Sequence, residues 1–242
     1  MSSRTTIFGL SLLVFLFKIP ACGSPLTPPT PEAYSLNVNP ADFVAEIDNP
    51  YMPLIPGTTY IYEGVTEEGN EHNEVYVSHE TKEIMGVTCV VVQDIVMVDG
   101  QVREITLDWF AQDKQGNVWY FGEDTREYKD GWVTSTKGSW EAGVDGALPG
   151  IIMKAQPSIN DTYRQEYSKG AAEDWAAIRS LSEISFVPTG YYGDLLLITE
   201  WSGLDNPPVY QQKYYAKGVG FVKAKSLDSN YELKLIDVHY EP

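Results

Sequence analysis

Apolar and polar residues alternate at a spacing of two along most of the chain, and this pattern predicts β-strands. Residues 58–63 (TTYIYE) and 74–82 alternate in this way. Residues 87–98 form an almost continuous β-branched run, which is typical of a strand buried on both faces. Asp99-Gly100 directly after it is a hairpin signal. These segments, with the hairpin that follows, predict an antiparallel meander between about Glu74 and Glu123.

The hairpin at 104–125 is the clearest element of the sequence. Residues 113–117 (DKQGN) are typical of a type I turn closed by a left-handed Gly116, with Asp113 facing Asn117. That register pairs Ala111 with Trp119 and Trp109 with Phe121. One face then carries Leu107, Trp109, Ala111, Trp119 and Phe121, and the other carries Asp108, Phe110, Gln112, Val118 and Tyr120. We expect the first face to be core and the second, which is amphipathic, to be able to line a ligand site.

The second half of the chain is also mostly strand-like. Strands are predicted at 162–167, 183–188, 194–201, 209–215, 220–225 and 231–240. Residues 171–181 (AAEDWAAIRSL) favour two or three helical turns, although their surroundings are strand-like. Residues 137–157 are rich in Gly and Pro and predict a long irregular loop. Such a loop is either a lid over a binding site or a plug that fills one end of a barrel with its apolar residues.

The first 22 residues have the features of a targeting segment. Arg4 precedes a short apolar run, Ile7 to Phe17, that matches a secretory signal peptide and is too short to span a membrane. Ile19-Pro20-Ala21-Cys22 resembles a bacterial lipobox, which would make Cys22 the lipidated N-terminus. Cleavage after Gly23 without lipidation is the alternative.

The remaining chain divides into a tether and one domain. Residues 23–40 contain Pro25, Pro28, Pro29 and Pro31 early on and predict an extended tether. Residues 41–242 are long enough for a single β-rich domain. Its first part, 41–57, contains three further prolines, which exclude a regular helix, so we expect it to wrap the fold as a loop.

The charge of the chain is strongly acidic, with 17 Lys and Arg against 34 Asp and Glu and a net charge of −17. Removal of residues 1–22 takes away Arg4 and Lys18 and no acid, so the mature charge becomes −19. This argues against nucleic acids and anionic lipid surfaces as partners, because phosphate contacts require clustered Lys and Arg. The membrane would be reached only through a lipidated Cys22.

Cysteine and histidine residues offer little chemistry. Apart from Cys22, the chain has only Cys89, which lies in an apolar run and is expected to be a buried small side chain. The three histidines, His72, His79 and His239, match no zinc spacing. Calcium is a better candidate because several loops are rich in acids, and Glu141 with Asp145 is the pair that we select. No cofactor is otherwise expected.

Enzyme motifs are missing from the sequence. It has no glycine-rich phosphate loop, dinucleotide fingerprint or nucleophile elbow. The remaining catalytic template is a pair of carboxylates in an aromatic cleft, as in glycoside hydrolysis, with Asp108, Glu141, Asp145 and Glu166 as the candidate acids. A carbohydrate-binding protein without activity would use the same aromatic side chains.

Three phrases resemble a loose group of uncharacterised secreted bacterial β-rich proteins and lipoproteins. Residues 49–60 (NPYMPLIPGTTY) are similar to the group's NPYFPLxPGxxW, 187–195 (VPTGYYGDL) to its VPAGxFxxxL, and 215–223 (YAKGVGFVK) to its YAPGVGLVK. Tyr60 replaces the usual tryptophan and Lys217 the usual proline. The resemblance implies a half-open or closed antiparallel barrel, similar to lipocalins and periplasmic lipoprotein carriers, and it implies no activity.

The sequence therefore predicts an all-β protein whose meander forms a curved sheet or barrel, secreted or held at the bacterial cell envelope. A barrel of this kind can enclose a small apolar or amphipathic ligand, or contact another envelope component. The candidate ligand-binding residues are Asp108, Phe110 and Tyr120 of the hairpin and Trp140, Ile151 and Met153 of the 137–157 loop. We expect this function to be non-enzymatic.

The lipobox interpretation gives a direct prediction. Replacement of Cys22 by serine (Cys22→Ser) removes the thiol that would be acylated, so the mature chain should move from the membrane fraction to the soluble fraction. Western blotting of fractionated cells measures this. An unchanged membrane fraction would exclude lipidation at Cys22.

Overall fold

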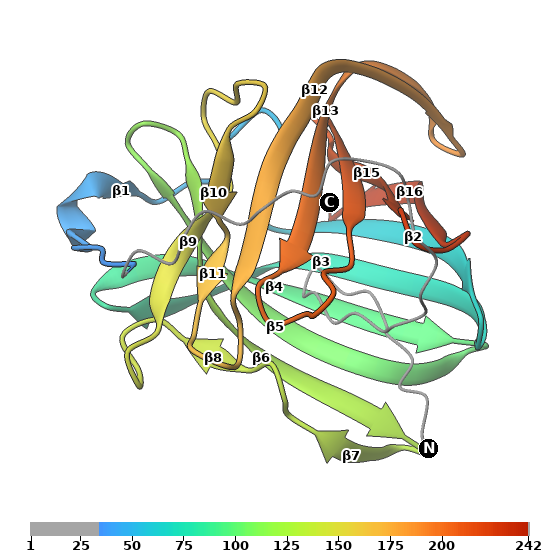
Figure 1. Cartoon of the computed structure of the whole chain (residues 1–242), viewed down its shortest axis with the longest axis horizontal. Coiled ribbons are helices and arrows are strands. Elements are labelled where there is room, and N and C mark those ends of the chain that lie inside the picture. Colours follow the sequence, from blue (N-terminus) through green and yellow to red (C-terminus); the bar gives the residue numbers. More distant parts are fainter. Residues whose placement is uncertain (1–33, 242) are drawn as a thin grey trace.

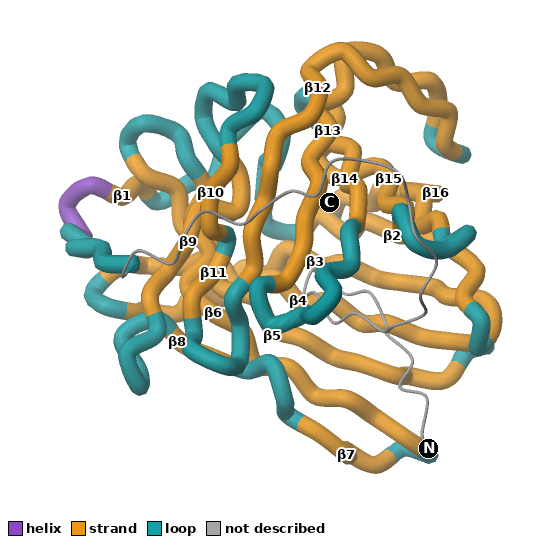
Figure 2. Tube along the Cα trace, in the orientation of Figure 1, coloured by secondary structure: helices purple, strands orange, loops and turns teal. Residues whose placement is uncertain are grey.

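The computed structural model describes residues 34–241, which form sixteen strands and one 3-10 turn, η1 (Pro40–Asp42). The first nine strands are β1 (Phe43–Val44), β2 (Thr58–Thr66), β3 (Gly69–Ile84), β4 (Val87–Val98), β5 (Gln101–Asp113), β6 (Val118–Lys129), β7 (Trp132–Ser135), β8 (Trp140–Glu141) and β9 (Leu148–Met153). The others are β10 (Thr162–Arg164), β11 (Glu166–Tyr167), β12 (Asp174–Val187), β13 (Gly190–Ser202), β14 (Gln211–Ala216), β15 (Gly220–Ser226) and β16 (Glu232–Tyr240). Figure 2 shows that strands make up most of the described trace.

Residues 1–33 and 242 lie outside the described part of the chain. The predicted signal peptide, Cys22 and most of the predicted tether are among them. The described end of the tether lies against the fold, because the Tyr34 hydroxyl donates to the Pro149 carbonyl at 2.8 Å and its ring packs edge-on against Tyr167. Within residues 34–241, no helix has the length and apolar character needed to cross a membrane.

A single antiparallel sheet contains all sixteen described strands. Thirteen of them follow the order β10-β12-β13-β14-β15-β16-β2-β3-β4-β5-β6-β9-β11, while β1 pairs with β5, and β7 and β8 pair with β6. Strands β3 to β6 follow each other as the predicted meander. In Figure 1 the orange and red strands β12 to β15 stand across the curved cyan-to-green sheet of β2 to β6. Asp99 and Gly100 between β4 and β5 both have positive φ, 48° and 75°, as their hairpin turn requires. The predicted all-β fold and its nearly closed barrel are confirmed.

The two ends of the sheet meet in one short segment, residues 162–167. Its first part, β10, pairs with β12, and its last part, β11, pairs with β9. Only Gln165 separates the two, and its N–H donates to the Asp174 carbonyl at 2.9 Å. Because one extended segment supplies both terminal strands, the sheet leaves few unpaired backbone groups at this seam. We call residues 162–167 the closing segment.

The hairpin of β5 and β6 has the predicted turn. The Asp113 N–H donates to the Asn117 carbonyl at 2.9 Å, Gly116 has a φ of 91°, and Ala111 pairs with Trp119. The predicted Trp109–Phe121 pair is wrong, because a bulge after Trp109 places Gly122 opposite it.

The two faces of this hairpin have different surroundings, and most of the side chains on each face are buried. Asp108, Phe110 and Tyr120 point into the barrel and are at most 3% exposed. The opposite face is covered by β1, where the Phe43 ring packs edge-on against Trp119 and Phe121 at centroid distances of 6.3 and 5.5 Å. The sequence interval 41–57 wraps the fold as expected and supplies this cover.

Two predicted elements need correction. The helix predicted at 171–181 is strand, because β12 begins at Asp174 and pairs with both β13 and β10. Pairing on both sides outweighs the helix propensity of its alanines. The loop predicted at 137–157 contains β8 and β9, both of which pair with β6, and β9 also pairs with β11. It is therefore part of the barrel wall, with Ile152 and Met153 buried.

The close approach of β9 to the closing segment predicts that the stability of the fold depends strongly on Gly150. A Cβ atom at this position would lie 2.4 Å from the carbonyl carbon and oxygen of Gln165, so Gly150→Ala must push β9 and the closing segment apart. We expect a loss of at least about 2 kcal/mol in the free energy of unfolding, as for an overpacked core. Urea unfolding of the mature protein measures it.

Gly193→Ala is the matched control. A Cβ atom there would meet only the Tyr191 side chain, at 3.9 Å, and its backbone does not require glycine. Equal destabilisation by the two substitutions would contradict the proposed role of the close approach at Gly150.

Candidate functional site

A cavity of about 60 Å³ lies inside the barrel, between the β2–β5 meander and strands β14 to β16. Aromatic side chains form much of its wall: Tyr60, Tyr62, Phe110, Tyr215 and Phe221. Met52, Leu54, Val75, Val92 and Leu233 add aliphatic surface. Its volume exceeds the roughly 10–15 Å³ that one water molecule needs, so it has room for several waters or a small organic group.

The rim of the cavity is formed by two distant parts of the sequence. Residues 50–54 of the N-terminal loop lie against the turn between β14 and β15, where the Gly218 N–H donates to the Pro50 carbonyl at 2.7 Å. The Lys217 ammonium lies 5.5 Å from the centre of the Tyr51 ring. A Cβ on Gly220 would already touch Pro53, at 3.7 Å. Residues 49–60 and 215–223, which are the first and third phrases of the sequence resemblance, therefore meet at the cavity.

One end of the cavity is polar and contains Asn73, Asp94, Gln211 and Lys213. All four are at most 6% exposed. We call this group the polar end. Gln211 and Lys213 are two residues apart on β14, so both side chains point to the same side of the sheet.

The Lys213 ammonium has a partner, whereas the Gln211 amide has none among the described residues. The Lys213 Nζ lies 2.7 Å from Glu200 Oε2, and the other oxygen of Glu200 accepts a bond from Gln165 Nε2 at 2.9 Å. Among the described residues, neither the nitrogen nor the oxygen of the Gln211 amide has a hydrogen-bond partner. Because a buried polar group without a partner is costly, the amide is suited to bind a molecule in the cavity.

Behind the cavity, the inward side of β5 and β6 is lined with carboxyl and hydroxyl groups. The Tyr120 hydroxyl donates to Asp108 Oδ1 at 2.5 Å and lies 3.1 Å from Glu123 Oε2. The hydroxyls of Thr106 and Thr125 are 2.8 Å apart and extend the network to Glu104 and Glu123. Burial, with the neighbouring acids, raises the pKa of Asp108 and Glu104 well above their ordinary values.

A second acidic group lies beside the closing segment. Glu166 on β11 accepts a bond from the Trp140 indole at 2.9 Å and shares a hydrogen bond with Asp174. Burial raises the pKa of Glu166 well above its ordinary value, and it raises that of Asp174 to about 7. These two carboxyls therefore hold a proton between them near neutral pH.

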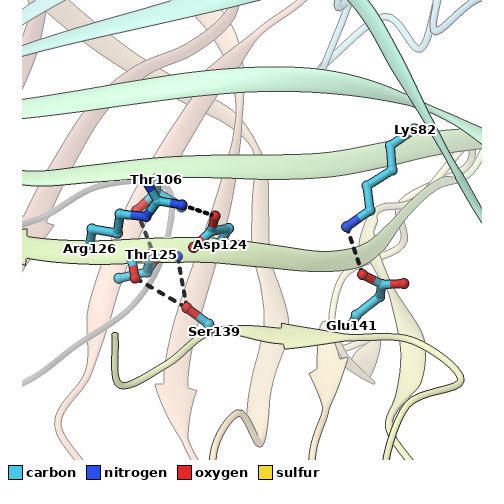
Figure 3. A network of polar contacts seen from close by, with 7 residues as sticks. All are labelled: Lys82, Thr106, Asp124, Thr125, Arg126, Ser139 and Glu141. Atoms are coloured by element: carbon cyan, nitrogen blue, oxygen red, sulfur yellow. Dashed lines mark hydrogen bonds and ion pairs between the residues drawn. The ribbon is translucent and has the colours of Figure 1, made fainter. Parts of the chain in front are cut away.

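On the other side of β5 and β6, a polar network attaches the β8 region to the sheet (Figure 3). The Ser139 hydroxyl bonds the N–H and the carbonyl of Thr125, at 2.9 and 3.1 Å. The Lys82 Nζ lies 2.6 Å from Glu141 and 3.3 Å from the centre of the Trp109 ring. These contacts fix β8, and with it the buried Trp140.

The candidate ligand-binding residues occupy three different environments. Phe110 lines the cavity. Tyr120 stacks on Phe110, with ring centroids 4.9 Å apart, and holds Asp108, so both residues support the wall from behind. Trp140, Ile151 and Met153 lie away from the cavity, with Trp140 packed edge-on against Tyr120 and β9 forming part of the barrel wall. The 137–157 segment therefore does not cover the cavity.

The candidate calcium and glycosidase acids also do not come together at the cavity. Glu141 is paired with Lys82, and Asp145 lies in the turn between β8 and β9 with a φ of 51°. Within residues 34–241, no group of three or more His, Cys, Asp and Glu side chains is arranged to hold a metal ion. Asp108 and Glu166 are buried and hydrogen-bonded, and none of the four acids lines the cavity. Cys89 is a buried free thiol, and burial raises its pKa to about 12.

Sequence reasoning missed the polar end. Its members come from β3, β4 and β14, which become neighbours only when the sheet curves. One signal was present, because Asp94 interrupts the β-branched run at 87–98 that predicted a strand buried on both faces. A charged residue in such a strand needs a polar environment inside the fold.

The sequence matches no family model and no curated protein. Among solved structures, the chain is similar to a candidate exported protein with a YmcC-like fold from Bacteroides fragilis, with 14% identity and a TM-score of 0.47, over 78% of this chain and 98% of that chain. It is also similar to a candidate lipoprotein from Parabacteroides distasonis, with 14% identity and a TM-score of 0.37, over 79% of this chain and 99% of that chain. At these values the likeness supports no assignment of function.

The buried acids predict that the protein is more stable in mild acid than in mild base. Burial raises the pKa of Glu71 from 4.5 to about 7, so its folded state holds a proton that the unfolded chain releases. The stability that this proton provides is fully present below pH 4.5 and is lost as the pH rises through 7. Asp174, with a pKa of about 7, acts in the same direction.

Glu71→Gln should therefore remove up to about 3 kcal/mol of the difference in unfolding free energy between pH 5 and pH 8. The glutamine keeps an oxygen for the Tyr231 hydroxyl, which donates to Glu71 at 3.0 Å. Urea unfolding at both pH values measures it, and the exposed Glu67→Gln is the control. A pH dependence equal to that of the unmodified protein would contradict the assignment.

Proposed function

We propose that this protein is exported to the bacterial cell envelope and binds a small amphipathic ligand in the barrel cavity, without catalysing a reaction. The proposed location is supported by the signal-like residues 1–22 and the lipobox-like sequence that ends at Cys22. The observation that carries the proposed binding is the Gln211 amide, which is 4% exposed, has no partner among the described residues and borders a largely apolar cavity. Binding sites for small ligands commonly combine an apolar wall with a few polar groups that set the orientation.

The arrangement of the acids supports binding over glycoside hydrolysis. A glycosidase presents two carboxyl groups to a sugar in an open cleft. Here Asp108 and Glu166 are buried in hydrogen bonds, and Glu141 is paired with Lys82. The aromatic wall of the cavity is made of Tyr and Phe, and it includes no tryptophan that would serve as a sugar-stacking platform.

A substitution that fills the cavity tests the proposed function. Ala224 on β15 is 1% exposed and lines the cavity, so the three additional carbons of Ala224→Leu occupy ligand space. Because a ligand that binds only the folded state raises its stability, we expect at least one of hexylamine, hexanol and hexanoate to raise the melting temperature of the mature wild-type protein. Ala224→Leu should reduce or abolish that increase.

Ala45→Leu is the matched control, because Ala45 is exposed and lies outside the cavity wall. It should retain the response of the wild type. Absence of any response to all three compounds in the wild type, or an equal response in Ala224→Leu, would contradict ligand binding in this cavity.

A further inference from the structure

The charges around the polar end favour one class of ligand over others. Lys213 is the only basic side chain in the cavity wall of the described residues, and Glu200 lies 2.7 Å from its ammonium. Its positive charge is therefore already balanced by a buried partner. A ligand anion would have to compete with Glu200 for it.

The polar end also contains an acidic side chain, Asp94. Asp94 lines the cavity at 1% exposure, and its charge is among the causes that raise the pKa of Glu71, Glu104 and Asp108. Four carboxyl groups therefore share one low-dielectric region. Because the raised pKa values favour the neutral forms of Glu71, Glu104 and Asp108, the carboxylate of Asp94 is the charge that faces the cavity; it would attract a cation there and repel an anion.

The Gln211 amide gives the cavity wall one unpaired acceptor and one unpaired donor. Among the described residues, neither its Oε1 nor its Nε2 has a hydrogen-bond partner, and the side chain lines the cavity. An ammonium group can donate to Gln211 Oε1 while it lies beside the carboxyl group of Asp94.

We propose that the ligand of the cavity is a small primary amine with an apolar body. This inference rests on the ligand-binding function proposed above. The ammonium group would lie at the polar end, where Asp94 and the Gln211 oxygen can accept its hydrogen bonds. Charge-assisted hydrogen bonds of this type are about twice as strong as neutral ones. The apolar body would contact the side chains of Tyr62, Val92 and Phe110.

The net charge of −17 supports the same ligand class at longer range. A surface with this excess of acids concentrates cations and repels anions near the protein, and it raises the association rate of cationic ligands. This effect is sensitive to salt, whereas the contact with the buried Asp94 is screened much less. The salt dependence of ligand binding therefore distinguishes attraction by the surface charge from recognition in the cavity.

Three six-carbon compounds that differ only in the end group test the inference. Isothermal titration of the mature protein at pH 7 and 150 mM salt with hexylamine, hexanol and hexanoate compares a cation, a neutral molecule and an anion. We expect the order hexylamine, hexanol, hexanoate, with hexylamine at least about tenfold tighter than hexanol. Ala224→Leu should weaken all that bind.

The variant Asp94→Asn keeps the shape of the side chain and removes its charge. It should reduce the affinity for hexylamine to within about threefold of that for hexanol and leave hexanol unchanged. Asp194→Asn is the control, because Asp194 is exposed and asparagine tolerates its positive φ of 49°. The order of the three compounds on the wild type decides the matter even when Asp94→Asn does not fold.

The two proposals fail in different ways. Hexanol or hexanoate binding as tightly as hexylamine, with loss of binding in Ala224→Leu, overturns the amine inference and leaves the ligand site in place. Binding of hexylamine that is equal in Asp94→Asn also overturns the inference. Absence of binding by all three compounds overturns both proposals.

Discussion

Closure of the sheet by the short segment 162–167 is the constraint on which the rest of the structure depends. β10 and β11 are separated by Gln165 alone, yet they pair with β12 and β9 at opposite ends of the strand order. This change of partner converts an open sheet into a nearly closed barrel. It also places Glu166 and Gln165 inside, beside Asp174 and Glu200, so the closing segment determines part of the interior chemistry as well as the shape.

The barrel interior combines a cavity with an unusually acidic lining. A filled barrel would bury apolar side chains at these positions, since buried carboxyl groups cost stability unless they are hydrogen-bonded or protonated. Here burial raises the pKa of several of them, and Tyr120, Thr106 and Thr125 supply hydrogen bonds. The cavity lies where this lining meets the aromatic wall, next to the unpaired Gln211 amide. The buried carboxyl groups lower the stability of the fold at neutral pH. Such a loss of stability is expected where the interior of a protein has a binding function.

The sequence predicted those parts of the fold that are encoded locally. Period-two alternation and the turns at Asp99-Gly100 and Asp113–Asn117 are local signals, and the β3 to β6 meander follows them. The helix predicted at 171–181 failed because pairing with β10 and β13 is a tertiary effect that alanine-rich sequence does not reveal. The same limit applies to the site. Phe110 was identified from the amphipathic face of its hairpin, whereas Asp94, Gln211 and Lys213 are brought together only by curvature of the whole sheet.

Native mass spectrometry of the mature protein, purified from the cell envelope without denaturation, tests the central claim most directly. We expect wild-type protein to carry a small-molecule adduct, and Ala224→Leu, which fills the cavity, to carry none. Wild-type protein at its bare polypeptide mass after correction for any lipid on Cys22, or an adduct that Ala224→Leu retains in full, would contradict it.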